Sequence, residues 1–455
     1  MLLNELFQPI IQSTPMAVMA RGTLEYLLDP QRLDELFART AQQQYTNELL
    51  FSSLVDLMAR VVLGQEPSVH AAYRKLEEQF PVSDQSVYNK LQHVELAVSA
   101  ALVQDSAQRA APVIDQLGGL PPLLPGFRVR FLDGNHLAAT EHRLPELRCL
   151  KAGPLPGLAL VILDQEHRTA TQVLLSEDGH AQERSLLEDV YPLVRRRDLW
   201  VADRNFCTVG FLFAVAQRQG FFAIRQHGSL PGQLVGKRRS RGRGDTGRLF
   251  EQRFQVADAE GQILTLRRVT VVLDQPTRDG DPEIHILTNL PGTKATAATV
   301  ADLYRQRWTI EGLFFEVSQT LSCEIDTLCY PKAALFAFCL GLLASNAVAL
   351  LKAALRAEHG EEVVSQQLSA YYLALEIRQT YAGMMVAIPP VHWEQFRELS
   401  AAAMAEVLRH IASQVSLQRY RKTPRGPKKP RTKRVPHRKG KHVSTAQVIG
   451  DRRRR

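Results

Sequence analysis

Paired cysteines, a secretory leader and internal repeats are all missing from this sequence of 455 residues. It has five cysteines, and no two of them form a CxxC pair. An odd number of unpaired cysteines argues against a disulfide-stapled secreted fold and a structural zinc site, and fits a reducing cytosol. The opening residues, MLLNELFQPI, show neither a basic segment nor a small-residue cleavage site, so we expect no signal peptide. These absences favour a cytoplasmic globular protein.

Charge is very unevenly distributed along the chain. The formal net charge is +9, but residues 419–455 alone hold sixteen Lys or Arg and one acid, a local balance of +15 that leaves −6 for the rest. The whole chain is 45% hydrophobic, which suffices for a large core in about two to four domains. The basic stretch, taken as 416–455, predicts a tail that is disordered when free and that binds a polyanion, most often nucleic acid.

The first 120 residues predict an all-helical domain, because apolar residues recur at helical spacing and glycine is rare. Residues 69–80 and 84–102 form two such segments around Pro81-Val82-Ser83, with Ser83 placed to cap the second. That outline fits a DNA-binding helix-turn-helix, and it fits an ordinary helical hairpin as well. The interpretation of residues 1–120 as a DNA-binding domain depends on the first of these readings.

A Gly/Pro-rich linker at 118–126 precedes a change to strand-like sequence, and residues 125–350 are expected to form one domain. Short apolar runs, some alternating with helical segments, predict a mixed sheet with covering helices, and hence the mixed α+β class. The expected strands are 128–133, 158–164, 169–175, 199–203, 221–226 and 283–290. Residues 227–282 read as a β-rich insertion between the last two of these strands.

The insertion contains a basic segment, GKRRSRGRGDTGR, at 236–248. Its cations Lys237, Arg238 and Arg239 are candidates for gripping DNA phosphates. The alternative is a solvated hairpin tip.

Residues 333–351 contain no charge over nineteen positions, a length that reaches the membrane-spanning range. Small residues together with Ser345 and Asn346 suit a buried core helix better, and we expect no membrane association. A helical region is expected over 351–415.

A helix is expected over 304–318, where Tyr304, Arg307 and Glu311 share one face at i, i+3 and i+7. Such a face is often a solvated salt-bridge surface. Two more carboxylates, Asp133 and Asp203, each follow an expected strand, where ligands commonly bind in such sheets. Three carboxylates brought together could hold two hard divalent cations for phosphoryl transfer. Spacing alone does not establish this, because the chain has 47 acids.

These residues resemble the signature of bacterial insertion-sequence transposases of the DDE class. Asp133 after a strand, Asp203 in DRNF, and Tyr304-x2-Arg307-x3-Glu311 after TNL are similar to the group with the Y-R-E-K signature, the "insertion sequence four" family. The resemblance covers roughly 125–350. One position departs from it, because Ser318 stands where the signature has lysine.

The resemblance implies a ribonuclease-H-like core in which Asp133, Asp203 and Glu311 hold two Mg²⁺ ions, with Mn²⁺ as a substitute. It implies that Tyr304 and Arg307 contact phosphates of the DNA end, and Arg305 is a candidate to replace the missing lysine. Trp308 is expected either to stack on a displaced base or, as the more ordinary role for tryptophan, to pack in the core.

The function implied is a transposase that cuts its element's ends and joins the free 3′-OH to target DNA. The expected partners are double-stranded DNA, both the terminal inverted repeats and the target, and a second copy of the chain. The resemblance also implies cut-and-paste with a DNA hairpin step, in the bacterial cytoplasm at the nucleoid. Two alternatives stay open: a catalytically inactive or domesticated DNA-binding protein, and a basic-tailed RNA- or ribosome-associated protein.

Overall fold

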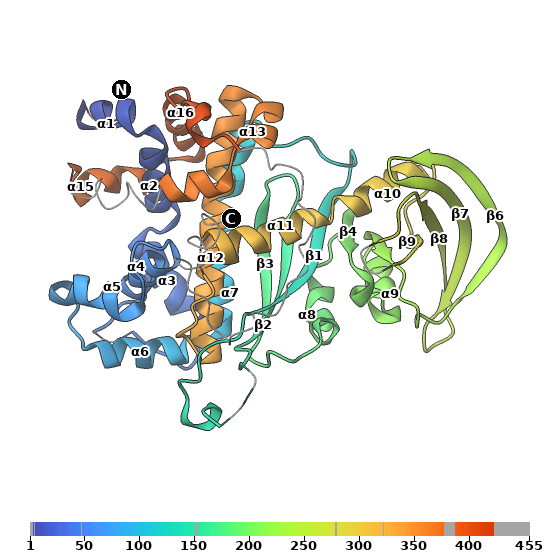
Figure 1. The fold of residues 1–455 in the computed structure, drawn as a ribbon, viewed down its shortest axis with the longest axis horizontal. Helices are drawn as coiled ribbons and strands as arrows, with labels where there is room; N and C mark the ends of the chain where they lie inside the picture. Colours follow the sequence, from blue (N-terminus) through green and yellow to red (C-terminus); the bar gives the residue numbers. More distant parts are fainter. Residues whose placement is uncertain are drawn as a thin grey trace, which may run out of the picture. The chain divides into compact units, whose positions relative to one another are not determined.

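A nine-stranded mixed sheet forms the centre of the computed structural model, which describes residues 3–422 except 4, 47, 150, 152, 278–279, 322 and 377–386. Its strand order is β3-β2-β1-β4-β5-β9-β8-β7-β6, as Figure 1 shows. β1 runs parallel to β4 and β4 to β5, and every other neighbouring pair is antiparallel. The strands are β1 (Arg128–His136), β2 (Leu158–Asp164), β3 (Thr169–Ser176), β4 (Asp198–Ala202), β5 (Phe221–Arg225), β6 (Gln233–Gly244), β7 (Gly247–Ala257), β8 (Ile263–Leu273) and β9 (Glu283–Thr288).

The order β3-β2-β1-β4-β5, with β2 antiparallel to both its neighbours, is a ribonuclease-H-like core, so the expected fold class is confirmed. The expected insertion supplies β6, β7 and β8. Because β9 pairs with both β5 and β8, the insertion extends the same sheet instead of forming a layer of its own.

Both faces of the core strands are buried, because successive side chains point to opposite faces. In β4, Val201 belongs to one hydrophobic cluster, while Trp200 and Ala202 belong to another. The second cluster is completed by α8 (Leu187–Val190) and α9 (Val209–Gln217). The first is completed by longer helices, so the sheet is the middle layer of three.

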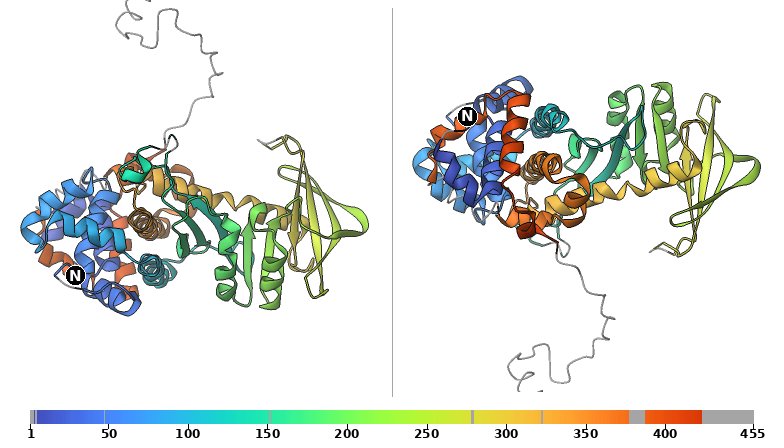
Figure 2. Two further views of the ribbon diagram at one scale, coloured as in Figure 1. Left: turned by 90° about the horizontal axis from the view of Figure 1, so that it is seen from below. Right: turned by 90° about the horizontal axis from the view of Figure 1, so that it is seen from above.

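Two long helices cover the first face, α7 (Leu96–Gln116) and α12 (Pro331–His359). They lie between the sheet and the N-terminal helices, as both views in Figure 2 show. The N-terminal helices are α1 (Gln8–Ser13), α2 (Pro15–Leu27), α3 (Pro30–Thr40), α4 (Phe51–Val62), α5 (Val69–Leu76) and α6 (Asp84–His93). Side chains of α3 to α6 share one hydrophobic cluster with β1, β2 and β4. The expected limits at 120 and 125 therefore stay predictions, because apolar packing continues across them.

The segments expected to form a helix-turn-helix are α5 and α6. Ser83 caps α6 as predicted, since its hydroxyl accepts a hydrogen bond from the Ser86 N–H. The Lys90 ammonium donates to the Tyr45 carbonyl at 2.9 Å and lies over the Phe37 ring, so its side chain is used within the fold. DNA binding by α6 stays a prediction.

The uncharged stretch 333–351 lies in α12. In the part of the chain that the structure describes, α12 alone is long and apolar enough to cross a membrane, and its apolar window is wholly buried in the protein. Its interpretation as a core helix is confirmed.

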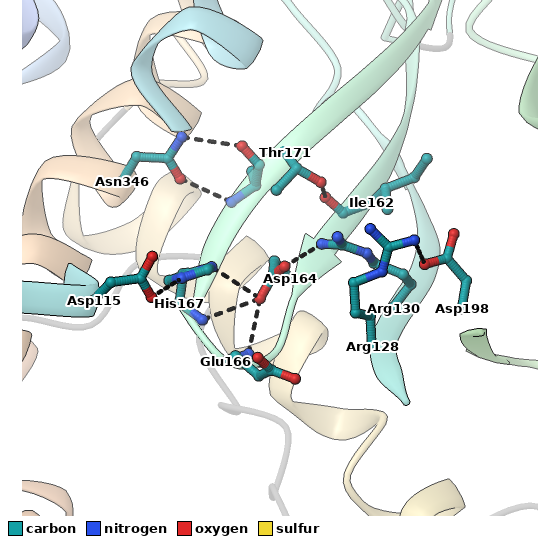
Figure 3. Close-up of polar contacts among 11 residues, drawn as sticks. Asp115, Arg128, Arg130, Ile162, Asp164, Glu166, His167, Thr171, Asp198 and Asn346 are labelled. Carbon is teal, nitrogen blue, oxygen red and sulfur yellow. Dashed lines mark hydrogen bonds and ion pairs between the residues drawn. The ribbon is translucent and has the colours of Figure 1, made fainter. Parts of the chain in front are cut away.

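Asn346, which is fully buried in α12, ties the helix to two neighbours. Its amide accepts from the Ala170 N–H at 2.8 Å and donates to the Ala170 carbonyl and the Ser106 hydroxyl. β3 is an edge strand, so this amide takes the place of a neighbouring strand at Ala170 (Figure 3).

The described part of residues 351–415 is mostly helical. It contains α13 (Glu361–Gln367), α15 (Pro390–Trp393) and α16 (Ala401–Ala412). Trp393, Phe396 and residues of α16 form a hydrophobic cluster with α1 and α2. The short 3₁₀ helix η9 (Leu417–Tyr420) continues past the expected tail boundary at 416, and residues 423–455 lie outside the described residues.

A polar cluster joins α7 to the hairpin between β2 and β3 (Figure 3). Asp164 pairs with Arg130 and with the His167 ring, which also contacts Asp115 of α7 at 2.9 Å. Hydrogen bonding to Asp164 and Asp115 raises the pKa of His167 to about 9 against the opposing effect of burial. Burial raises the pKa of Asp164, but His167 and Arg130 together lower it to about 2.

His167→Gln is therefore expected to destabilise the protein by about 1–3 kcal/mol at pH 6 and much less at pH 10. The folded pKa of His167 lies above its unfolded value of about 6.5, so the stabilisation is complete below pH 6.5 and is lost as the pH rises through about 9. Urea midpoints of both proteins at the two pH values measure this. Equal differences at pH 6 and pH 10 would show that the imidazolium charge is not the source.

Candidate active site

Asp133 and Asp203 each follow the last residue that pairs between two neighbouring parallel strands, β1 and β4. Leu132 pairs with Ala202 as the last partners between β1 and β4, and the two acids are the next residues along the chain. The expectation that β1 ends at Asp133 was wrong, because the antiparallel pairing with β2 continues to His136. Pairing with β4 does stop at Leu132. The two carboxylates therefore start side by side.

The expected single helix over 304–318 is interrupted. α10 (Ala297–Arg305) ends in a turn at Gln306-Arg307, α11 (Trp308–Phe315) follows, and a π-helical turn, η7 (Glu316–Thr320), comes after it. The Arg307 N–H donates to the Tyr304 carbonyl at 3.1 Å, a tight i to i−3 bond. α11 packs against β1, so Tyr304, Arg307 and Glu311 still face the two aspartates.

The five motif residues form two hydrogen-bonded sets, and the Arg307 guanidinium of one set lies 5.9 Å from the Tyr304 ring centroid of the other. The Tyr304 hydroxyl donates to Asp203 Oδ1 at 3.2 Å. Arg307 donates through Nη1 to Asp133 Oδ2 at 2.9 Å and through Nη2 to Glu311 Oε1 at 2.7 Å. Asp133 and Glu311 are thus separated by a single guanidinium group, although they are 178 positions apart in the sequence. The bridging role of Arg307 was not anticipated from the sequence.

Burial governs the electrostatics of this group. It raises the pKa of Asp133 to about 7, with Arg307 opposing the shift and the carboxylates of Glu183 and Asp203 adding to it. Burial, together with Asp203, raises the pKa of Tyr304 to about 12, so the phenol stays protonated. Burial lowers the pKa of Arg307, but Asp133 and the other acids raise it above its ordinary value, and the guanidinium stays charged.

The donor chemistry of this site fits a hard divalent cation, because Asp133, Asp203 and Glu311 offer carboxylate oxygens. Arg307 occupies the space between Asp133 and Glu311. Among the described residues, no three His, Cys, Asp or Glu side chains lie close enough together to hold a metal ion. The donors are thus suited to Mg²⁺ or Mn²⁺ only after the guanidinium moves.

One of the motif's neighbours differs from its expected environment. The prediction that Trp308 packs in the core is wrong, because its side chain is 69% exposed. Ile310, Leu313 and Val317 fill the buried stripe of the helix instead. Arg305 is also exposed, and its guanidinium pairs with Asp245 at 2.8 Å and with Asp302. Ser318, in the position of the signature lysine, donates to the Phe314 carbonyl of its own helix.

The basic segment of the insertion, 236–248, lies mostly on β6 and also includes the tight turn from β6 to β7. Lys237, Arg238 and Arg239 lie on β6, the exposed edge of the sheet. Arg238 stacks over Phe250 and lies 3.3 Å from Glu283. Within the described ranges, neither Lys237 nor Arg239 forms an ion pair or a side-chain hydrogen bond.

A fourth acid at this site, Glu183, was not predicted from the sequence. It lies against Gly134 and accepts a hydrogen bond from Asn205. No pattern in the sequence marks it. It belongs to the short 3₁₀ helix η4 (Glu183–Leu186), far along the chain from the motif, and is one of 47 acids.

Comparison with known proteins places this arrangement in a family. Residues 126–347 match the family model described as "Transposase DDE domain", from just before β1 into α12. The chain carries a transposase DDE domain. The predicted resemblance to insertion-sequence DDE transposases is confirmed at this level, while membership of the Y-R-E-K group stays a prediction.

Two similar proteins accompany the transposase domain match. The Sinorhizobium fredii protein y4zB, provisionally named a transposase, is 31% identical over 126 residues, which are 27% of this chain and 33% of that protein. The cryo-EM structure of a piggyBac transposase synaptic complex with hairpin DNA aligns over 82% of each chain, with a TM-score of 0.38 and 8% identity. An alignment at that level supports no further conclusion.

Proposed function

We propose that this transposase domain cleaves DNA at the ends of an insertion sequence and joins the free 3′-OH to target DNA, with Asp133, Asp203 and Glu311 as the metal ligands. The observation that supports the proposal is that Asp133 and Asp203 follow the last residues paired between two parallel strands, while Arg307 links Asp133 to Glu311 of α11. Two bound Mg²⁺ ions, or Mn²⁺ in their place, would activate the attacking oxygen and stabilise the leaving one.

The residues around the acids have separate roles in this proposal. Arg307 moves from its carboxylate partners to a phosphate of the DNA end, which its planar fork can bind with two hydrogen bonds. The Tyr304 hydroxyl, which stays protonated, holds Asp203 and faces the same phosphates. Trp308, exposed beside them, stacks on a base displaced from the duplex end.

The reaction has two stages at the same acids. Water attacks first and frees a 3′-OH, and that hydroxyl then attacks a second phosphodiester. We include in the proposal a hairpin step on the departing end, cut-and-paste transposition, and a homodimer that bridges two ends at the bacterial nucleoid. The DNA substrates are the terminal inverted repeats and the target duplex.

A second candidate is a DNA-binding protein derived from a transposase and no longer catalytic. One observation favours it: Ser318 occupies the signature lysine position and supplies no cation there. The test is Mg²⁺-dependent nicking of a plasmid that carries the sequences flanking the gene. Wild type is expected to cut and Asp133→Asn is not, whereas binding without cutting by both proteins would favour the second candidate.

The edge strand β6 is proposed to follow the DNA backbone. The double variant Lys237→Gln/Arg239→Gln is expected to lower the slope of log affinity against log salt concentration by about 2, because each lost phosphate contact removes about 0.9. Affinity for a duplex fragment, measured by fluorescence anisotropy at several salt concentrations, tests this.

Arg218→Gln, an exposed cation at the end of α9, is the matched control and is expected to leave the slope unchanged. An unchanged slope in the β6 variant would show that this strand does not contact the DNA phosphates.

A further inference from the structure

We propose that Glu183 is a positioning residue of the active site, a fourth carboxylate whose charge strengthens divalent-cation binding at Asp133 and whose hydrogen bond holds the loop after Asp203. The inference rests on the proposed function, since it assigns a further residue to the same metal site.

The first observation is a close approach that only glycine permits. Gly134 directly follows Asp133, and a Cβ atom placed on it would lie 2.4 Å from Glu183 Oε1 and 2.6 Å from both Cγ and Cδ. The backbone of Gly134 does not require glycine, because its φ lies outside the left-handed region. Glycine within a strand weakens it and often marks a close approach by another group. Here the approaching group is the Glu183 carboxylate.

The second observation is the link from Glu183 to the other aspartate. Asn205 Nδ2 donates to Glu183 Oε2 at 3.1 Å, and Asn205 lies two residues after Asp203. One carboxylate therefore touches the residue after Asp133 through one edge and the loop after Asp203 through the other. It joins the two strand ends on which the site is built.

The third observation is charge. Within the described ranges, Glu183 forms no ion pair, although its side chain is half-buried beside Asp133. In the part of the chain that the structure describes, Arg307 is the one cation in ion pairs with these acids, and it contacts Asp133 and Glu311. Four carboxylates carry more charge than one guanidinium neutralises, and a pair of divalent cations would neutralise the excess.

The structural alternative is that Glu183 only accepts a hydrogen bond from the Asn205 amide and begins a short helix. Glutamine would retain the size of the side chain and its oxygen acceptor while removing the charge. Glu183→Gln therefore separates the two roles.

The test is Mn²⁺ binding to the full-length protein in the presence of a short duplex of the sequences flanking the gene, so that Arg307 can leave the acids for a phosphate. Binding is measured by calorimetry and by loss of the free Mn²⁺ EPR signal, with the duplex alone as the blank. Glu183→Gln is expected to weaken Mn²⁺ binding about tenfold, as substitutions around metal ligands commonly do, and to leave the unfolding temperature unchanged. Glu188→Gln replaces an exposed acid of α8 and is expected to bind Mn²⁺ as wild type does.

Gly134→Ala provides a second variant that leaves every charge in place. Its added methyl group should displace Glu183 and weaken Mn²⁺ binding by a similar factor. The double variant should bind Mn²⁺ no more weakly than either single variant, since both substitutions remove the same contact.

The outcomes separate this inference from the function on which it rests. If wild type binds Mn²⁺ and cuts DNA while Glu183→Gln binds Mn²⁺ equally well, the role of Glu183 is overturned and the proposed function stands. A lower unfolding temperature with unchanged Mn²⁺ affinity would make Glu183 a purely structural residue. If wild type neither binds Mn²⁺ nor cuts DNA, both proposals fail.

Discussion

Asp133→Asn is expected to abolish Mg²⁺-dependent cutting of the element's ends and, in the absence of metal, to stabilise the folded protein at pH 8. Loss of a ligand that holds the reacting groups should cost several kcal/mol of transition-state stabilisation, a rate loss on the order of a thousandfold or more. Asparagine keeps an oxygen for Arg307 but is a poorer ligand for a hard cation. Single-turnover nicking of the flanking sequences measures the loss.

The gain in stability follows from the buried position of Asp133. Its folded pKa of about 7 lies above the unfolded value of 3.8, so its contribution is fully present below pH 3.8 and is lost as the pH rises through about 7. At pH 8 the wild type carries the cost of an ionised, largely buried carboxylate, which asparagine avoids. The gain should be about 1–4 kcal/mol, larger at pH 8 than at pH 5.

Urea unfolding in EDTA at both pH values measures this gain, with Glu188→Gln as a surface control that should change neither stability nor cutting. A variant that cuts like wild type would exclude Asp133 from the chemistry. A variant that cuts nothing but is destabilised at pH 8 would mean that Asp133 serves the fold.

Asn346→Leu is expected to cost about 3–5 kcal/mol of stability. Leucine has the same branching as asparagine and is larger, but it cannot bond the Ala170 N–H, the Ala170 carbonyl or the Ser106 hydroxyl. The Ala170 N–H and carbonyl would remain buried without partners at the point where α12 meets an edge strand, and the Ser106 hydroxyl of α7 would keep only its bond to the Val103 carbonyl. The shift of the urea unfolding midpoint, followed by circular dichroism, measures the cost.

Ser345→Ala is the matched control, since Ser345 is buried in the same helix one position earlier. It is expected to change stability by less than about 1 kcal/mol. If both substitutions had equal effects, the amide of Asn346 would not be what joins α12 to β3.

The sequence predicted the elements whose patterns are local and strong. The apolar runs of β2 and β4, the uncharged segment of α12 and the Ser83 cap are all readable within a few residues. The five motif residues could be named only through their resemblance to a family, because spacing alone does not bring Asp133 and Asp203 together. The register of β1 with β4 does that, and register depends on both strands.

Tertiary contacts explain what the sequence did not predict. β1 runs past Asp133 because β2 continues to pair with it, and the basic segment of the insertion lies mostly on a strand because β7 pairs with it. Trp308 is exposed because other apolar residues of α11 fill the buried stripe. Glu183 and the bridging role of Arg307 depend on side chains brought together from distant parts of the chain, and no local pattern signals either.

The most direct measurement is the anomalous scattering of Mn²⁺ in crystals of the protein bound to its element-end DNA. We expect anomalous density between Asp133 and Asp203, within ligand distance of Glu311, with Arg307 turned from these acids to a DNA phosphate. DNA cut in crystals whose Mn²⁺ lies elsewhere, with Arg307 still bridging Asp133 and Glu311, would contradict the assignment of these three carboxylates as the catalytic metal site.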